Sequence, residues 1–351
     1  MQYARLGDTG LVVSRLSFGA MTFGKSTGIF ASVAKVEEKL AHEMIARTLD
    51  AGINYFNTAD GYTGGQSEEI LGRALGARRK DVLIATKVGF RTGEALVHQG
   101  LSRQHIMASA EGSLRRLGTD YIDVYLVHRQ DRLTPIEETL DALNDLVRQG
   151  KVRYVGFSNW PAWRAAEAVG LQREHGWARF RAAELYYSLV GREVEHELAP
   201  FTQSAGIGIM VWSPLAGGFL TGKYTRENPA GDGGRLTGFD FLPYDRNLGH
   251  EVVERLRQIG NAHAASPAQV AIAWLLAKTH VATVLIGANK MAQLEDNLGA
   301  ADIQLTADEV TGLDKLTAPA PIYPNWFNER TVDAVATKAL SGEKTAGASS
   351  R

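Results

Sequence analysis

The sequence contains no cysteine among its 351 residues, which excludes disulfide bonds, thiol nucleophiles and thiolate metal sites. It also has no apolar run near the roughly 20 residues of a membrane span, and its first residues lack the apolar core of a signal peptide. Neither charge dominates, because 38 Lys and Arg stand against 39 Asp and Glu. We therefore expect no basic surface for nucleic acid, no membrane partner and a cytoplasmic location.

The sequence also shows no boundary between domains before its C-terminal extension. Apolar strand-like runs alternate with amphipathic helical stretches from residue 11 to about 316, without a Pro/Ser-rich linker or a run of one charge. We expect one domain over residues 1–318 and a C-terminal extension over 319–351. The last residues, SGEKTAGASSR, are small and polar, which predicts disorder.

The alternation predicts a (β/α)8 TIM barrel of the α/β class. No G-x-G-x-x-G follows the first strand, which argues against an open dinucleotide-binding sheet. Hydroxyls before prolines, at Thr134 and Ser266, predict helix N-caps, and an N-terminal hairpin is expected at 3–6 and 11–13. Strands are expected near 15–19, 53–57, 82–87, 122–128, 152–158, 181–185, 207–212 and 283–286, and helices at 37–50, 67–75, 102–117, 136–148, 161–175 and 194–205.

Three of the predicted strands lead directly to a polar residue. The segments FNTADGY, LIATKV and DVYLVH carry Tyr62, Lys87 and His128 at or just beyond their ends. In a parallel barrel these ends face one cavity, so we expect the three side chains to converge. A phenol, an ammonium and an imidazole together form a proton-donating site.

This set of residues resembles the aldo-keto reductase family, whose catalytic tetrad is an Asp, a Tyr, a Lys and a His at these places. The resemblance runs from about residue 5 to 316 and is closest to the branch of bacterial reductases and potassium-channel β-subunits. GQSEEILGRAL and SPLAGGFLTGKY are its most specific stretches. One tetrad member departs from the family pattern, because Asn57 stands where the family has Asp.

The resemblance implies carbonyl reduction, in which negative charge develops on the substrate oxygen and must meet donors. Tyr62 would be the general acid, Lys87 would favour its phenolate, and His128 would donate to the oxygen. Asn57 supplies no negative charge, so we expect Lys87 to lose a partner that keeps it protonated. Asp60 lies close in sequence and is a candidate to replace that partner in part, but the favoured interpretation is a solvated loop acid.

The same resemblance implies an NADPH site. Ser158, Asn159 and Glu184 would contact the nicotinamide carboxamide, although Gln is usual at position 184, and Trp212 would stack on the ring. A long glycine-rich loop after the seventh strand would cover the cofactor. Lys223 and Arg235 would approach its phosphates, and Lys290 would select the adenosine 2′-phosphate, hence NADPH over NADH. The other implied contacts are Met21, Ser213, Leu215, Gly217, Gly287, Asn289, Gln293 and Asn297.

The leading interpretation is NADPH-dependent reduction of a small aldehyde or ketone, with alcohol oxidation as its reverse. The alternative from another class is a cofactor-binding regulatory or partner subunit with weak turnover. Retention of His128 favours the enzyme, whereas Asn57 favours the alternative. A metal-dependent hydrolase or isomerase is disfavoured, because the strand ends lack a metal-ligand set and paired carboxylates. We expect no metal.

Overall fold

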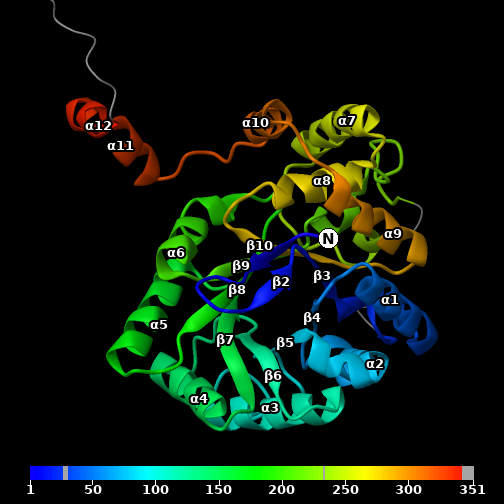
Figure 1. Ribbon diagram of the computed structural model, residues 1–351, viewed down its shortest axis with the longest axis vertical. Helices are drawn as coiled ribbons and strands as arrows, with labels where there is room; N and C mark the ends of the chain where they lie inside the picture. Colours follow the sequence, from blue (N-terminus) through cyan, green and yellow to red (C-terminus); the bar gives the residue numbers. More distant parts are fainter. Residues whose placement is uncertain (27–30, 232–233, 342–351) are drawn as a thin grey trace, which may run out of the picture. The chain divides into compact units, whose positions relative to one another are not determined.

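The computed structural model describes residues 1–26, 31–231 and 234–341, and its centre is a closed barrel of parallel strands (Figure 1). The ring order is β10-β3-β4-β5-β6-β7-β8-β9, which confirms the predicted (β/α)8 TIM barrel. Contacts divide the chain into Met1–Thr317 and Ala318–Arg351. The prediction of disorder concerns 342–351, outside the described residues.

Helices alternate with the barrel strands and surround them (Figure 1). The strands are β3 (Leu16–Gly19), β4 (Tyr55–Asn57), β5 (Leu83–Val88), β6 (Ile122–Val127), β7 (Val152–Ser158), β8 (Phe180–Tyr186), β9 (Gly208–Trp212) and β10 (Val281–Ile286). The helices of the same unit are α1 (Glu38–Asp50), α2 (Gln66–Leu75), α3 (Arg103–Leu117), α4 (Ile136–Arg148), α5 (Ala162–Glu174), α6 (Leu198–Ala205), α7 (Arg246–His263), α8 (Pro267–Leu276), α9 (Met291–Gly299) and α10 (Ala307–Leu316). The second unit contains α11 (Asn325–Arg330) and α12 (Ala334–Leu340).

One of the two predicted helix caps is present. Ser266 caps α8 in a capping box, in which its hydroxyl accepts from the Gln269 backbone N–H and the Gln269 side chain accepts from the Ser266 N–H. The expected cap at Thr134 is wrong, because Pro135 itself occupies the N-cap of α4 without a side-chain cap. The Thr134 hydroxyl donates instead to the Asp131 carboxylate, at 2.7 Å.

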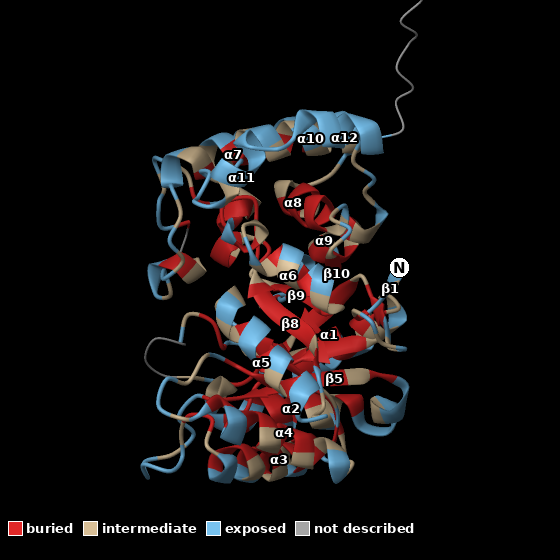
Figure 2. Ribbon diagram, turned by 90° about the vertical axis from the view of Figure 1, so that its left-hand side faces the viewer, coloured by how far each residue is buried: buried red, intermediate tan, exposed pale blue. Residues whose placement is uncertain are grey.

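The strands are buried on both faces (Figure 2), and alternate residues separate the two layers of the core. Residues that face outward pack against the helices. Those that face inward form a smaller cluster that fills the barrel, and its buried members are Leu6, Val13, Tyr55, Ala85, Val124, Leu126, Ala182, Met210, Ala282 and Leu285. The interior is therefore a packed core and not a channel.

The N-terminal hairpin packs against one end of this interior cluster. Strands β1 (Tyr3–Arg5) and β2 (Val12–Ser14) pair in antiparallel register, and Leu6 and Val13 contribute buried side chains to the cluster. The Asp8 N–H donates to the Gly206 carbonyl just before β9, at 2.8 Å, which holds the turn of the hairpin against the barrel. With the N-terminal ends of the strands occupied by the hairpin, the opposite ends are left for polar side chains.

Gly156 on β7 shows how tightly the interior is packed. A Cβ atom at this position would lie 2.2 Å from the Ala182 carbonyl oxygen and 2.7 Å from the Leu126 side chain. Neither neighbour is able to move freely, because one is the backbone of the adjacent strand and the other is a buried leucine. Glycine is therefore required here for close packing.

We predict that Gly156→Ala lowers the free energy of unfolding by about 2 kcal/mol or more, because the added methyl overpacks the barrel. Gly170→Ala is the matched control, since Gly170 is exposed on α5 with no atom within 4 Å of the added Cβ. It should raise stability by roughly 0.5–1 kcal/mol through helix propensity. Urea unfolding of both variants measures the two values, and a shift of the same sign in both would contradict the packing argument.

Candidate active site

The alternation of side chains along each strand, which builds the barrel core, also explains the positions of the polar side chains at the C-terminal ends of the strands. Asn57, Lys87, His128, Glu184 and Trp212 each lie two residues beyond a member of the interior cluster, namely Tyr55, Ala85, Leu126, Ala182 and Met210. Because strand side chains repeat with a period of two, all five point to the same interior. The barrel thus places one polar layer directly above its apolar layer.

Lys87 is at the centre of this polar layer. Its side chain has no exposed surface, and its ammonium donates to the Asn57 side-chain oxygen at 2.6 Å. The same ammonium donates to the Thr58 carbonyl at 2.9 Å and to the Tyr62 hydroxyl at 3.1 Å. The structure thus brings Tyr62 and Lys87 together as expected, and Asn57 contacts the same ammonium.

A carboxylate also reaches Lys87, from the opposite side of the barrel. Glu184 on β8 places one carboxylate oxygen 3.2 Å from the Lys87 ammonium and accepts with the other from the Asn57 amide, at 2.6 Å. The expectation that Lys87 lacks a carboxylate partner is therefore wrong. It considered positions 57 and 184 separately, whereas the closed barrel brings them into contact.

Asp60 is not a solvated loop acid, which corrects a second expectation. Only 2 % of its surface is exposed, and the nearby charges that act on it are those of Glu68 and Arg116. Burial, followed by the Glu68 charge, raises the pKa of Asp60 to about 7. Asp60 therefore belongs to the layer between the barrel and its helices, and Glu184 is the acid beside Lys87.

Glu184 keeps the buried lysine charged. Burial disfavours the ammonium, but the Glu184 charge and the contact with Tyr62 outweigh this cost, so the pKa of Lys87 is raised above its ordinary value. Burial also raises the pKa of Tyr62, and the Lys87 charge opposes that rise without cancelling it. At neutral pH the site thus presents a phenol that keeps its proton beside an ammonium.

His128 completes the group next to Tyr62. Its ring lies edge-on to the Tyr62 ring with centroids 5.6 Å apart, and the Phe90 ring packs on it at 4.5 Å. Burial, then the charges of Lys87 and Arg129, hold the pKa of His128 well below its usual range. The imidazole is therefore neutral and retains one N–H for donation.

Ser158, Asn159 and Trp212 form a hydrogen-bonded row beside this group. The Ser158 hydroxyl donates to the Glu184 carbonyl at 2.8 Å, and the Asn159 amide donates to the Ser158 hydroxyl at 2.8 Å. The Trp212 indole N–H donates to the Asn159 oxygen at 3.1 Å. The Trp212 ring lies parallel to Phe241, with centroids 6.2 Å apart, and presents a flat aromatic surface at the end of β9.

The loop after β9 turns sharply at Ser213 and Gly217. The Ser213 hydroxyl accepts from the Gly217 N–H at 3.0 Å, and both residues have positive φ. A Cβ on Gly217 would lie 2.9 Å from the Leu236 side chain, so glycine allows the later part of the loop to pack here. Leu215 is half-buried within this turn, and Met21 is half-buried after β3.

The residues expected near the adenosine lie together after β10. The Asn289 N–H donates to the Gln293 side chain at 2.9 Å, and the Asn297 amide donates to the Gly287 carbonyl at 3.3 Å. These contacts tie the start of α9 to the end of the strand. Lys290 occupies the N-cap of α9.

Three cations lie close to Lys223. Burial lowers the pKa of Lys223, and the charges of Lys290, Arg235 and Lys35 lower it further, so all three lie close enough to act on the Lys223 ammonium. Within the described parts of the chain none of them forms an ion pair with an acid. Sequence reasoning missed Lys35, because it lies in a segment without periodic pattern. A cluster of unneutralised cations is a site for a polyanion.

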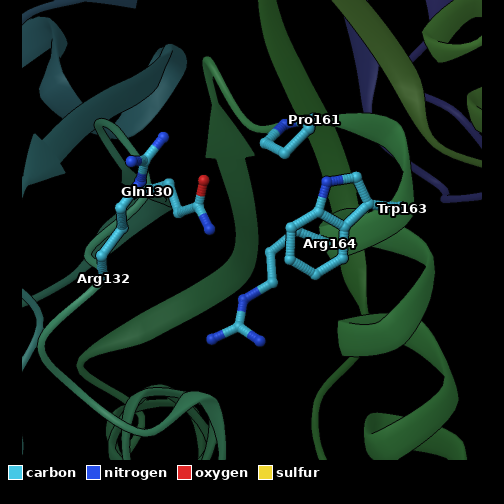
Figure 3. Close-up of a pocket in the computed structure, with 5 residues that line it drawn as sticks. All are labelled: Gln130, Arg132, Pro161, Trp163 and Arg164. Atoms are coloured by element: carbon cyan, nitrogen blue, oxygen red, sulfur yellow. The ribbon is translucent and has the colours of Figure 1, made fainter.

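An open pocket of about 520 Å³ lies beside the strand ends (Figure 3). None of the residues predicted for the site lines it. Its side chains come from the segments that follow β6 and β7, shortly after His128 and Asn159, and they are Gln130, Arg132, Pro161, Trp163 and Arg164. The pocket therefore lies at the same end of the barrel as the polar layer, at its rim.

Residues 15–318 match the family model described as the Aldo/keto reductase family. The chain is 38% identical over 334 residues to a probable voltage-gated potassium channel subunit beta of Oryza sativa subsp. japonica, covering 92% of this chain and 98% of that protein. It is 34% identical over 351 residues to the versiconal hemiacetal acetate reductase of Aspergillus parasiticus, covering 92% and 99%. The chain is therefore a member of the aldo/keto reductase family. It is an NAD(P)H-dependent oxidoreductase.

Among the residues that the structure describes, no helix has both the length and the apolar character needed to cross a membrane. Likewise, no group of three or more metal-ligating side chains occurs among residues 1–26, 31–231 and 234–341.

We predict that Asp60→Asn stabilises the protein at pH 8 but much less at pH 5. The folded protein holds a proton on Asp60 up to about pH 7, while the unfolded chain releases it near pH 4. The stability contribution of Asp60 therefore falls as pH rises through this window, and the amide avoids that loss. Denaturant unfolding should show a gain of about 1–3 kcal/mol at pH 8. A change in the free energy of unfolding that is the same at pH 5 and pH 8 would contradict a raised pKa for Asp60.

Proposed function

We propose that the protein reduces an aldehyde or ketone to the alcohol with NADPH, with Tyr62 as the general acid and alcohol oxidation as the reverse reaction. The observation that carries this proposal is the 3.1 Å contact between the Tyr62 hydroxyl and the fully buried Lys87 ammonium. When Tyr62 gives up its proton, the phenolate that remains lies beside the fixed positive charge of Lys87. This arrangement suits a reaction in which negative charge develops on the substrate oxygen and must be neutralised by a proton.

Each residue of the group has a separate task. Tyr62 keeps its proton at neutral pH and gives it to the carbonyl oxygen, and Lys87 then stabilises the phenolate by a few kcal/mol. Neutral His128 donates its N–H to the same oxygen and orients it. Asn57 holds Lys87 in place through its side-chain oxygen. A bound nicotinamide cofactor supplies the hydride.

The remaining residues fit a phosphorylated dinucleotide. The cluster of Lys35, Lys223, Arg235 and Lys290 suits its phosphates, and the Trp212 ring suits the nicotinamide face. Ser158 and Asn159 lie at the end of β7, where they would hold the carboxamide. Met21, Ser213, Leu215, Gly217, Gly287, Asn289, Gln293 and Asn297 are proposed as the other contacts.

A cofactor-binding partner subunit with weak turnover is the second candidate, because a relative is named as a channel subunit. The two candidates differ in one measurable property. A reductase oxidises NADPH when offered aldehydes, ketones, quinones or sugars, whereas a partner subunit binds NADPH and turns over slowly with all of them. The contact of Tyr62 with charged Lys87 favours the reductase, since binding alone does not require a poised acid.

Cofactor choice is tested at Lys290. Lys290→Ala should weaken NADPH binding by about 1–3 kcal/mol and leave NADH nearly unchanged, because only NADPH carries the 2′-phosphate. Lys223→Ala should weaken both cofactors, since both carry the pyrophosphate. Lys315→Ala removes an exposed charge on α10 and should change neither. Fluorescence titration measures the affinities, and equal losses for both cofactors in Lys290→Ala would exclude a 2′-phosphate contact.

The acid is tested by Tyr62→Phe, which removes only a hydroxyl. We expect turnover of a good carbonyl substrate to fall by roughly 10²–10⁴ while NADPH affinity is retained. Tyr3→Phe is the control, because the Tyr3 hydroxyl donates to Gly52 in the hairpin region, away from the polar layer. Steady-state kinetics and cofactor titration separate the two effects. Retained turnover in Tyr62→Phe would assign the proton to another donor.

A further inference from the structure

Three side chains from three strands form a closed triangle inside the barrel. Lys87 comes from β5, Asn57 from β4 and Glu184 from β8, which lies four positions from β4 in the ring of eight. All three are buried, with at most a few per cent of their surface exposed. The three distances are 2.6 Å from Lys87 to Asn57, 2.6 Å from Asn57 to Glu184 and 3.2 Å from Glu184 to Lys87.

We propose that Glu184 is a positioning residue for the reaction, the carboxylate that keeps Lys87 charged opposite Tyr62, and that Asn57 is a directional bridge between the two. This inference rests on the proposed function of Tyr62 and Lys87. It assigns Glu184 to the proton-donating group, whereas the resemblance to the family implied a contact with the cofactor.

The directions of the hydrogen bonds support the bridge. An ammonium only donates and a carboxylate only accepts, so the residue between them must accept on one side and donate on the other. The Asn57 amide has one group of each kind, with its oxygen toward Lys87 and its nitrogen toward Glu184. An Asp at position 57 beside Glu184 would instead bring two carboxylate oxygens to 2.6 Å, which forces one of them to hold a proton.

Positions 57 and 184 are therefore coupled. The triangle requires one carboxylate and one amide, and geometry allows either order, because the Asn57 oxygen already lies closer to Lys87 than the Glu184 oxygen does. The two departures from the family pattern, Asn57 and Glu184, are then a single relocation of negative charge across the barrel. Both Glu184 oxygens are engaged within the triangle.

The test is an exchange of the two residues. Glu184→Gln alone should lower kcat by about tenfold or more. It should also shift the alkaline limit of the pH–rate profile to lower pH, because burial then favours the neutral amine of Lys87 and no carboxylate opposes this. Asn57→Asp alone should also lower activity, since it crowds two carboxyls. The double variant Asn57→Asp/Glu184→Gln should recover kcat to within about threefold of the parent and restore its alkaline limit.

The second readout needs neither cofactor nor substrate. The titratable groups around Lys87 are Glu184 on β8, Tyr62 after β4 and His128 after β6, with Tyr55 below Glu184. With Glu184 present, the pKa of Lys87 is higher in the folded protein than in the unfolded chain. The charged lysine therefore contributes its full stability at every pH below the unfolded pKa, and this contribution is lost only as pH rises through the folded pKa. In Glu184→Gln the folded pKa drops below the unfolded one, so the loss of stability should be largest at pH 7 and shrink toward pH 10.

Glu195→Gln is the matched control. Glu195 is a half-buried carboxylate that pairs with Arg192 at 2.7 Å and accepts from Tyr187, and it has no contact with the triangle. Its removal should cost stability by an amount that is constant between pH 7 and pH 10, because Arg192 does not titrate there.

Two results would overturn the proposal. A double variant no more active and no more stable than Glu184→Gln would show that the charge cannot be moved to position 57. A stability loss in Glu184→Gln that does not depend on pH would show that Lys87 does not depend on Glu184 for its charge. Absence of carbonyl reduction in the parent protein would refute the proposed function alone, because the stability measurements still decide the role of Glu184.

Discussion

A lysine ammonium without exposed surface is the constraint on which the site depends. An unpaired buried charge costs several kcal/mol, so the fold must supply an opposite charge and hydrogen-bond acceptors around it. Glu184, Asn57 and the Thr58 carbonyl do this at distances of 3.2, 2.6 and 2.9 Å. The ammonium also donates to the Tyr62 hydroxyl at 3.1 Å, which is where the proposed chemistry needs positive charge.

The barrel makes this arrangement possible by its alternation. The apolar layer formed by Tyr55, Ala85, Ala182 and Met210 excludes water beneath the polar layer, and the same strands carry the polar side chains two residues further on. Electrostatic interactions are stronger in such a water-excluded interior than at the surface. The same strand register therefore determines both the packing of the apolar layer and the electrostatic environment of Tyr62 and Lys87.

The sequence predicted the parts of the structure that local patterns determine. The strand-helix alternation predicted the barrel, and the strand-end positions of Lys87 and His128 predicted that they meet Tyr62. The partnership of Glu184 with Lys87 was not predictable in this way, because it joins strands that meet only across the closed barrel. Lys35 and the burial of Asp60 were missed for a related reason, since both lie in loops whose path no periodicity describes.

The protonation state of Lys87 decides whether Glu184 keeps this buried lysine charged. Nitrogen NMR of protein labelled at the lysine side chains, with the Lys87 signal assigned by its loss in Lys87→Met, reports whether this nitrogen is an ammonium or an amine. We expect an ammonium signal for Lys87 that persists to pH 10 in the parent protein and converts to the amine at lower pH in Glu184→Gln. A Lys87 signal that is already an amine at pH 8 in the parent would contradict it.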